Sequence, residues 1–279
     1  MHEEPQYRRP LESLFDDRAA CTVIRSNATK TTLKAPLLAG DEPNLFVKLY
    51  HFDEWCGYGL ALLRGIGGRR DMRVARRLLE IGVPTPQPIA VRSRRMHPLR
   101  PARILYAAKW IEGSQTFDEA LRGAETGSGS ASSLIEAGGR FVGFLHEKGV
   151  SPRDMNPSNL LLRKKADGSP EFFLIDYERM RLSRSVSYDV RVRNLAQVGV
   201  NLGPIAENYE ELLCRGYSQV CLGVDIVAMA RDVSRQTLKF RESNRVALEK
   251  RFKKIGNARE KDKREKEKRA KAKAAPTAD

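Results

Sequence analysis

The sequence contains few cysteines and no long apolar run. Its four cysteines are scattered without a CxxC pair, so neither a zinc site nor a disulfide framework is expected. No stretch approaches the roughly 20 consecutive apolar residues that a bilayer-spanning helix needs. The first segment, MHEEPQYRRPLESLFDD, lacks the apolar core of a secretory signal. These absences predict a protein that stays in the cytoplasm.

Acidic residues are in the minority, and the imbalance is concentrated at the C-terminus. The chain has 50 Lys and Arg against 35 Asp and Glu, a net charge of +15. Residues 241–279 alone hold 15 basic and 7 acidic residues, a surplus of +8. The final stretch has almost no apolar side chain, so it is expected to be a solvated helix or disordered. Such a tail could bind an anionic membrane surface or nucleic acid, or could only aid solubility; nucleic acid is the least expected of these partners.

The remaining composition is that of a globular protein, with 41% hydrophobic and 30% charged residues. Alternating, β-branched stretches dominate the first hundred residues, and one helical pattern, GRRDMRVARRLLEIG, interrupts them. Helical patterns dominate the second half, after a Gly- and Ser-rich stretch at 123–133 that is predicted to be a surface loop. The pattern predicts an α+β protein with a small β-rich lobe and a helical lobe.

We place the boundaries of these parts by the change in pattern. The predicted parts are an N-terminal extension (1–19), a β-rich N-lobe (20–111), a helical C-lobe (112–246) and a basic tail (247–279). The link between the lobes is expected near Trp110–Gly113.

The strongest chemical signal is the segment SPRDMNPSNLLL, which begins at Ser151. Asn159 follows Asp154 by five residues, and Asp176 closes the later apolar run FFLID. Phosphoryl transfer from ATP needs a carboxylate that accepts the proton of the acceptor hydroxyl, and oxygen ligands that hold Mg²⁺ on the phosphates. A single Asp before a strand is usually a cap or turn residue, but here three polar residues flank two apolar strands. We therefore predict Asp154 as the base, and Asn159 and Asp176 as metal ligands.

These segments resemble a known family. PRDMNPSNLLL resembles the catalytic loop HRDLxxxN of protein kinases, and LIDYER resembles the strand that ends in DFG. More closely, FVKLY, GVPTPQPIA, LHEKGVSPRDMNPSNLLL and FFLIDYERM resemble the lipopolysaccharide core kinases, which phosphorylate Kdo or heptose, over about residues 20–220. The resemblance implies a two-lobed protein-kinase-like fold, ATP and Mg²⁺ as cofactors, and a glycolipid or sugar acceptor. It also implies a position at the inner face of the inner membrane, where the basic tail could contact anionic head groups.

The resemblance further implies an ATP-binding lysine and its partner. Lys48, in NLFVKLY, matches the strand lysine that pairs with the α- and β-phosphates of ATP. Its carboxylate partner on the following helix would be Asp71, one methylene shorter than the usual Glu. Asp71 could instead cap the helix start, and Glu80 is a weaker rival for the pairing.

Several positions depart from the protein-kinase pattern. No GxGxxG precedes Lys48, and the corresponding turn is Arg25–Lys30. Pro152 replaces the His of HRD, Asn156 stands where protein kinases often carry Lys, and Glu178 replaces the Gly of DFG. No APE segment follows, which favours a small-molecule or glycolipid acceptor over a peptide. Two alternatives stay open: an atypical, compact protein kinase, and a non-catalytic kinase-like binding module.

Overall fold

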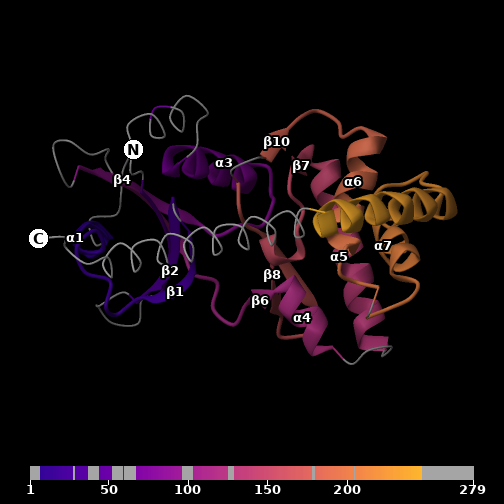
Figure 1. The fold of residues 1–279 in the computed structure, drawn as a ribbon, viewed down its shortest axis with the longest axis horizontal. Coiled ribbons are helices and arrows are strands. Elements are labelled where there is room, and N and C mark those ends of the chain that lie inside the picture. The colour runs from indigo at the N-terminus through magenta and orange to yellow at the C-terminus, as the bar shows by residue number, and fades with distance from the viewer. Residues whose placement is uncertain are drawn as a thin grey trace, which may run out of the picture.

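The computed structural model describes residues 7–27, 29–36, 44–51, 59, 67–95, 103–124, 129–177, 180–203 and 205–246. A β-rich lobe lies beside a helical lobe (Figure 1), so the predicted fold class is confirmed. The basic tail, 247–279, lies outside the described residues. The four-part division of the chain stays a prediction.

The N-lobe is built on a five-stranded antiparallel sheet. Its strand order is β1-β2-β3-β5-β4. The strands are β1 (Thr22–Ser26), β2 (Lys30–Ala35), β3 (Leu45–Tyr50), β4 (Pro88–Arg94) and β5 (Arg103–Lys109). The stretches predicted as strands form these five strands; β1 is exposed along its whole length, whereas β3 and β5 are mostly buried.

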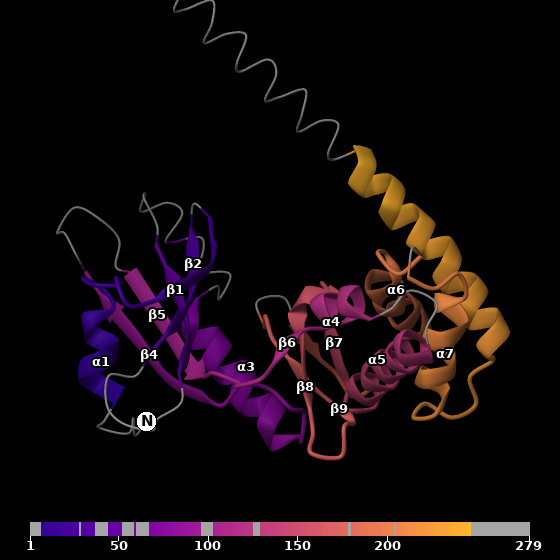
Figure 2. The same cartoon turned by 90° about the horizontal axis from the view of Figure 1, so that it is seen from below.

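Two helices cover opposite faces of this sheet (Figure 2). The short helix α1 (Arg8–Ser13) belongs to a separate apolar cluster, in which Leu11 packs with Val47, Leu49 and Leu105. The longer α3 (Gly68–Glu80) packs on the other face, where its apolar stripe joins the main core with Tyr106. Side chains alternate between faces along a strand, so β3 sends Leu45, Val47 and Leu49 to α1 and Lys48 to α3.

The C-lobe combines short strands with helices. Two small sheets, β6-β8-β9 and β10-β7, lie beside the helices. The elements are β6 (Gln115–Thr116), α4 (Phe117–Gly123), α5 (Gly129–Glu147), β7 (Val150–Pro152), the 3-10 turn η2 (Pro157–Asn159), β8 (Leu160–Lys164), β9 (Pro170–Leu174), β10 (Met180–Leu182), α6 (Tyr188–Gly199) and α7 (Tyr209–Ser218). A helix at 226–246 follows; it packs on the lobe through Met229 and Val233 and then extends away from it (Figure 2).

The helices α5 and α7 pack closely because glycines face the contact. A Cβ on Gly139 would lie 2.1 Å from the carbonyl oxygen of Leu213, and one on Gly216 would lie 1.9 Å from that of Glu136. The predicted loop at 123–133 is wrong in its second half, since α5 already begins at Gly129. Its first turn is helical despite its serines because Ala131 and Ile135 are buried in the lobe. Within the described residues, no helix is long and apolar enough to span a membrane.

Candidate active site

A cavity of about 440 Å³ lies between the two lobes. Its walls include Lys48 from β3, Trp110 and Ile111 from the link between the lobes, and Asn159 and Asp176 from the C-lobe. This volume falls within the range of ordinary small-molecule pockets. Three of the five predicted site residues therefore line one cavity.

Lys48 lies between two carboxylates. Its Nζ is 3.7 Å from Oδ2 of Asp71 and 3.5 Å from Oδ1 of Asp176. The Lys48 side chain is only 5% exposed and Asp71 is fully buried, whereas Asp176 is 36% exposed. A buried ammonium group is costly without opposite charge nearby, so the two carboxylates hold Lys48 at the cavity wall.

Tyr50 fixes the shorter carboxylate. Its hydroxyl donates a 2.6 Å hydrogen bond to Oδ2 of Asp71. Tyr50 lies two residues after Lys48 on β3 and therefore on the same face of the strand, toward α3. Glu80, the rival partner, instead pairs with Arg77 at 2.9 Å on the exposed side of α3. The hydroxyl of Tyr50 is a part of the site that the sequence interpretation missed, although the period of two along β3 would have placed it there.

The backbone of Asp176 is strained, and the next residue, Tyr177, is hydrogen-bonded to the rest of the protein. Its φ of +67° is the only positive φ of a non-glycine residue in the described part of the chain. Such strain persists only where the surroundings impose it. The Tyr177 hydroxyl is hydrogen-bonded to Oγ1 of Thr85. The hydroxyl of Thr85 in turn donates to the carbonyl oxygen of Leu174 at 2.7 Å. Thr85 is therefore the acceptor for Tyr177, and burial raises the pKa of Tyr177 to about 12, so its phenol stays protonated.

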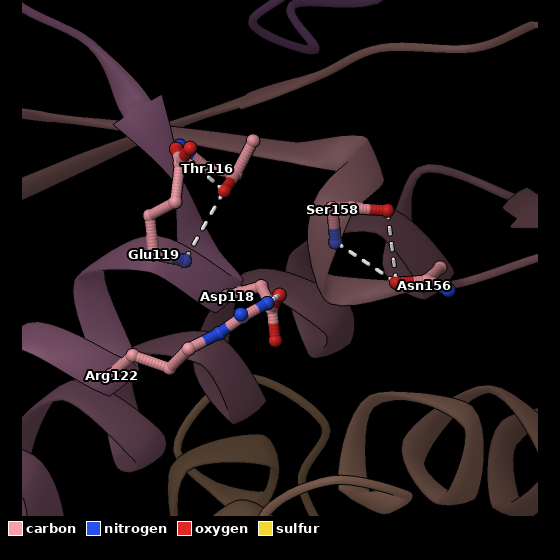
Figure 3. Close-up of polar contacts among 6 residues, drawn as sticks. All are labelled: Thr116, Asp118, Glu119, Arg122, Asn156 and Ser158. Carbon is pink, nitrogen blue, oxygen red and sulfur yellow. Dashed lines mark hydrogen bonds and ion pairs between the residues drawn. The ribbon is translucent and has the colours of Figure 1, made fainter. Parts of the chain in front are cut away.

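The loop that carries Asp154 lies between β7 and η2. The side-chain amide of Asn159 donates to the backbone oxygen of Asp154 at 3.2 Å. Asn156 caps the turn, because its Oδ1 accepts from both the N–H and the hydroxyl of Ser158 at 3.0 Å (Figure 3). The same view shows the capping box of α4, formed by Thr116 and Glu119, two residues that also line the cavity. Asn156, a departure from the protein-kinase pattern, thus shapes the turn that presents Asn159.

Asp154 itself lies at the surface and is not part of the cavity wall. The structure thus joins Lys48, Asp71 and Asp176 in one cluster and links Asn159 to the backbone of Asp154. Glu178 lies outside the described residues.

The oxygen ligands present fit Mg²⁺ only together with phosphates. Among the described residues, no group of three His, Cys, Asp or Glu side chains could hold a metal by itself. Asp176 offers a carboxylate, and Asn159 offers its amide oxygen because its amide nitrogen already donates to Asp154. Mg²⁺ commonly takes one or two protein oxygens and completes its shell with substrate phosphates and water. Asn159 and Asp176 suit a metal that arrives with a nucleotide.

Strands β1 and β2 line the cavity on either side of their connecting turn, which contains no glycine. Oδ1 of Asn27 accepts from the N–H groups of Thr29 and Lys30 at 3.0 and 2.8 Å, an Asx turn that ties the two strands together. Arg25 and Lys30 line the cavity on either side of this turn. Their positive charges, which the sequence interpretation did not single out, face the same space as Lys48.

A β-rich lobe and a helical lobe enclose a cavity with a lysine held between two carboxylates, the architecture of a protein-kinase-like phosphotransferase. The model of the Lipopolysaccharide kinase (Kdo/WaaP) family matches residues 59–217, more than half of the chain. The chain therefore belongs to this family of kinases, as the resemblance predicted. The match includes Asp71, Asp154, Asn159 and Asp176 but begins after Lys48.

One solved structure extends the likeness over both lobes. The structure of WaaP in complex with acyl carrier protein aligns with a TM-score of 0.59 and 21% identity. The alignment covers 89% of this chain and 98% of WaaP, so the likeness in fold includes the N-lobe. No match among curated proteins reached significance.

Proposed function

We propose that this kinase transfers the γ-phosphoryl group of ATP to a sugar hydroxyl, of Kdo or heptose, in the lipopolysaccharide core. The observation that carries the proposal is the position of Lys48, between Asp71 and Asp176 at the wall of a cavity that Asn159 also lines. Membership of the lipopolysaccharide kinase family supports the class of acceptor.

On the nucleotide side, Lys48 contacts the α- and β-phosphates, and Asp71 with Tyr50 fixes the direction of its ammonium group. Asn159 and Asp176 would hold Mg²⁺, which would neutralise charge on the phosphates. Arg25 and Lys30 add positive charge at the same cavity. Catalysis on this side consists of positioning and of charge stabilisation.

On the acceptor side, Asp154 orients the sugar hydroxyl and accepts its proton. Its surface position outside the cavity wall suits an acceptor that approaches from the solvent while ATP fills the cavity. The chain passes from Asp176 to the start of α6 at Tyr188 in twelve positions, through β10. This short connection leaves little chain for a peptide-binding segment and favours a sugar acceptor.

The test is transfer of radiolabel from γ-labelled ATP to purified core glycolipid, with a protein mixture offered in parallel. Wild-type enzyme is expected to label the glycolipid in the presence of Mg²⁺, and Asp154→Asn is expected to slow the labelling on the order of 100- to 10,000-fold. Label on protein with none on glycolipid would favour the atypical protein kinase. Absence of transfer to either, with nucleotide still bound, would favour the non-catalytic module.

We also propose that the basic tail, 247–279, keeps the enzyme at anionic membranes, where a glycolipid acceptor is located. The support is the charge surplus of +8 in residues 241–279. Deletion of 247–279 is expected to move the protein from the membrane fraction to the soluble fraction. Unchanged recovery with membranes would remove this role.

A further inference from the structure

Two amide side chains of α6 lie beneath the loop that carries Asp154. Asn194 and Gln197 are three positions apart and therefore lie on one face of the helix. The Nδ2 group of Asn194 donates to the carbonyl oxygen of Pro152 at 2.9 Å. The Nε2 group of Gln197 donates to the carbonyl oxygen of Arg153 at 2.9 Å, and Oε1 of Gln197 accepts from the N–H of Met155 at 3.1 Å. The backbone is thus held on both sides of Asp154.

The two amides also fix each other and are tied to the core. Nδ2 of Asn194 donates to Oε1 of Gln197 at 2.9 Å, and Oδ1 of Asn194 lies 3.1 Å from Nε2 of His146. Since Oδ1 can only accept, Nε2 of His146 carries the proton, and Nδ1 accepts from the hydroxyl of Tyr217 at 3.0 Å. Asn194, His146 and Tyr217 are all buried. The hydrogen bonds therefore run from α7 through α5 and α6 to the loop.

The loop itself contains no helix or strand at residues 153–156. A base must be held close to its productive position, because displacements of about 1 Å can cost on the order of 100-fold in rate. A loop without regular structure needs contacts of its own to reach that precision. Here these contacts come from neutral side chains, which fix the backbone without adding a charge beside Asp154.

We infer that Asn194 and Gln197 are positioning residues for phosphoryl transfer: they act through the loop backbone and set the location of Asp154. The inference rests on the proposed function, in which Asp154 is the base. Asp154 is the group that meets the acceptor, and the two amides do not touch substrate.

Gln197 gives the sharper test because it is only partly buried and both ends of its amide are used. Gln197→Glu keeps an acceptor for Met155 but cannot donate to Arg153. Gln197→Met keeps the length of the side chain and loses the hydrogen bonds to Arg153, Met155 and Asn194. We expect kcat to fall on the order of 10-fold for Gln197→Glu and up to about 100-fold for Gln197→Met, with KM for ATP unchanged.

A matched control is Gln219→Glu. Its Oε1 accepts from Arg140 at 2.9 Å on the exposed surface of the C-lobe, so the same chemical change occurs there outside the catalytic machinery. This variant is expected to keep the wild-type kcat. Thermal unfolding of all variants, with assays well below each Tm, separates loss of activity from loss of folded protein.

The decisive measurement is a double-mutant cycle with Asp154→Asn in the glycolipid transfer assay. If Asn194 and Gln197 act through Asp154, Gln197→Met is expected to cause little further loss of kcat in the Asp154→Asn background. Multiplicative losses in that background would overturn the inference, as would a kcat within about twofold of wild type for Gln197→Met. If Asp154→Asn itself keeps full activity, the assignment of the base fails, which is a separate result.

Discussion

The two halves of the active site are held in place by different forces. In the N-lobe, Lys48 is buried between the charges of Asp71 and Asp176. In the C-lobe, Asp154 is exposed, and neutral amides hold its loop by the backbone. In the proposed mechanism Lys48 binds phosphates, and neighbouring charges orient its ammonium group. Asp154 accepts a proton in that mechanism, and neutral contacts position it without changing its charge.

The strongest way to break this comparison is Asp154→Asn. The substitution keeps the shape of the side chain and the backbone contacts but removes the proton acceptor. We expect kcat for transfer to glycolipid to fall on the order of 100- to 10,000-fold, while Tm and nucleotide affinity stay at wild-type values. Steady-state kinetics and titration with a non-hydrolysable ATP analogue measure the two quantities. More than a tenth of the wild-type kcat would contradict the role of Asp154.

The charged half is tested by Asp71→Asn. This substitution takes the charge of one of two carboxylates away from the buried Lys48, which is expected to cost about 3 kcal/mol in the free energy of unfolding. The redirected ammonium group is expected to lower kcat/KM for ATP on the order of 10- to 100-fold. Denaturant unfolding and kinetics with varied ATP measure both effects.

Tyr50→Phe serves as its companion variant, since it removes the hydrogen bond to Asp71 and keeps the charge of that carboxylate. A smaller loss of about 1 kcal/mol is expected for it. Equal losses for Tyr50→Phe and Asp71→Asn would show that the charge of Asp71 contributes little.

His146, which is hydrogen-bonded to Asn194 behind the loop of Asp154, is expected to make stability depend on pH. Burial is the main cause that lowers the pKa of His146 from 6.5 to about 4. The hydrogen bond to Asn194 raises this pKa, and the charge of Arg191 lowers it further. Between these values the unfolded chain binds a proton that the folded protein does not. The contribution of His146 to the free energy of unfolding is therefore complete above pH 6.5. It is lost as the pH falls from 6.5 to about 4, by up to about 3 kcal/mol.

The free energy of unfolding at pH 7.5 and pH 5.5 measures this loss in wild type and in His146→Gln. The wild type is expected to lose more stability than the variant across this interval, in which ordinary carboxylates stay ionised. The same slope in both proteins would rule out His146 as the source.

The smallest effect is expected at Tyr177, which lies directly after Asp176 and is hydrogen-bonded to Thr85. Tyr177→Phe removes the hydrogen bond to Thr85 that anchors the residue after Asp176, at a cost of about 1 kcal/mol and about 2 to 4 °C in Tm. Tyr188→Phe removes a comparable hydrogen bond to Asp232 at the surface and is expected to cost less than about 0.5 kcal/mol. Scanning calorimetry of the two variants compares them directly, and equal shifts would contradict a special role for Tyr177.

The sequence was most informative where chemistry restricts the residue type. The spacing of Asp154, Asn159 and Asp176 suffices to predict a kinase-like site, because few other functions need those groups around two strands. The family and the fold class followed from the same segments and are confirmed. The roles of the individual residues stay predictions.

What could not be predicted depends on contacts between distant segments. Thr85 meets Tyr177 across 92 positions, and Asn194 meets Pro152 across 42, and neither pair has a local signal. The start of α5 at Gly129 was missed because burial of Ala131 outweighs the weak helix propensity of its neighbours. Tertiary contacts, and not local preference, decided these features.

The division of β3 into two faces has a consequence for how Lys48 comes to face the cavity. Leu45, Val47 and Leu49 are buried against α1, and Lys48 alternates with them on the opposite face. A slip of one residue in the pairing of β3 with β2 would place the ammonium group in the apolar cluster and three aliphatic side chains in the cleft. The penalty for that slip comes from the cluster around α1, which contains no catalytic group. The strand register that directs Lys48 into the cavity is thus stabilised by the apolar cluster on the opposite face of the sheet, whose residues do not line the cavity.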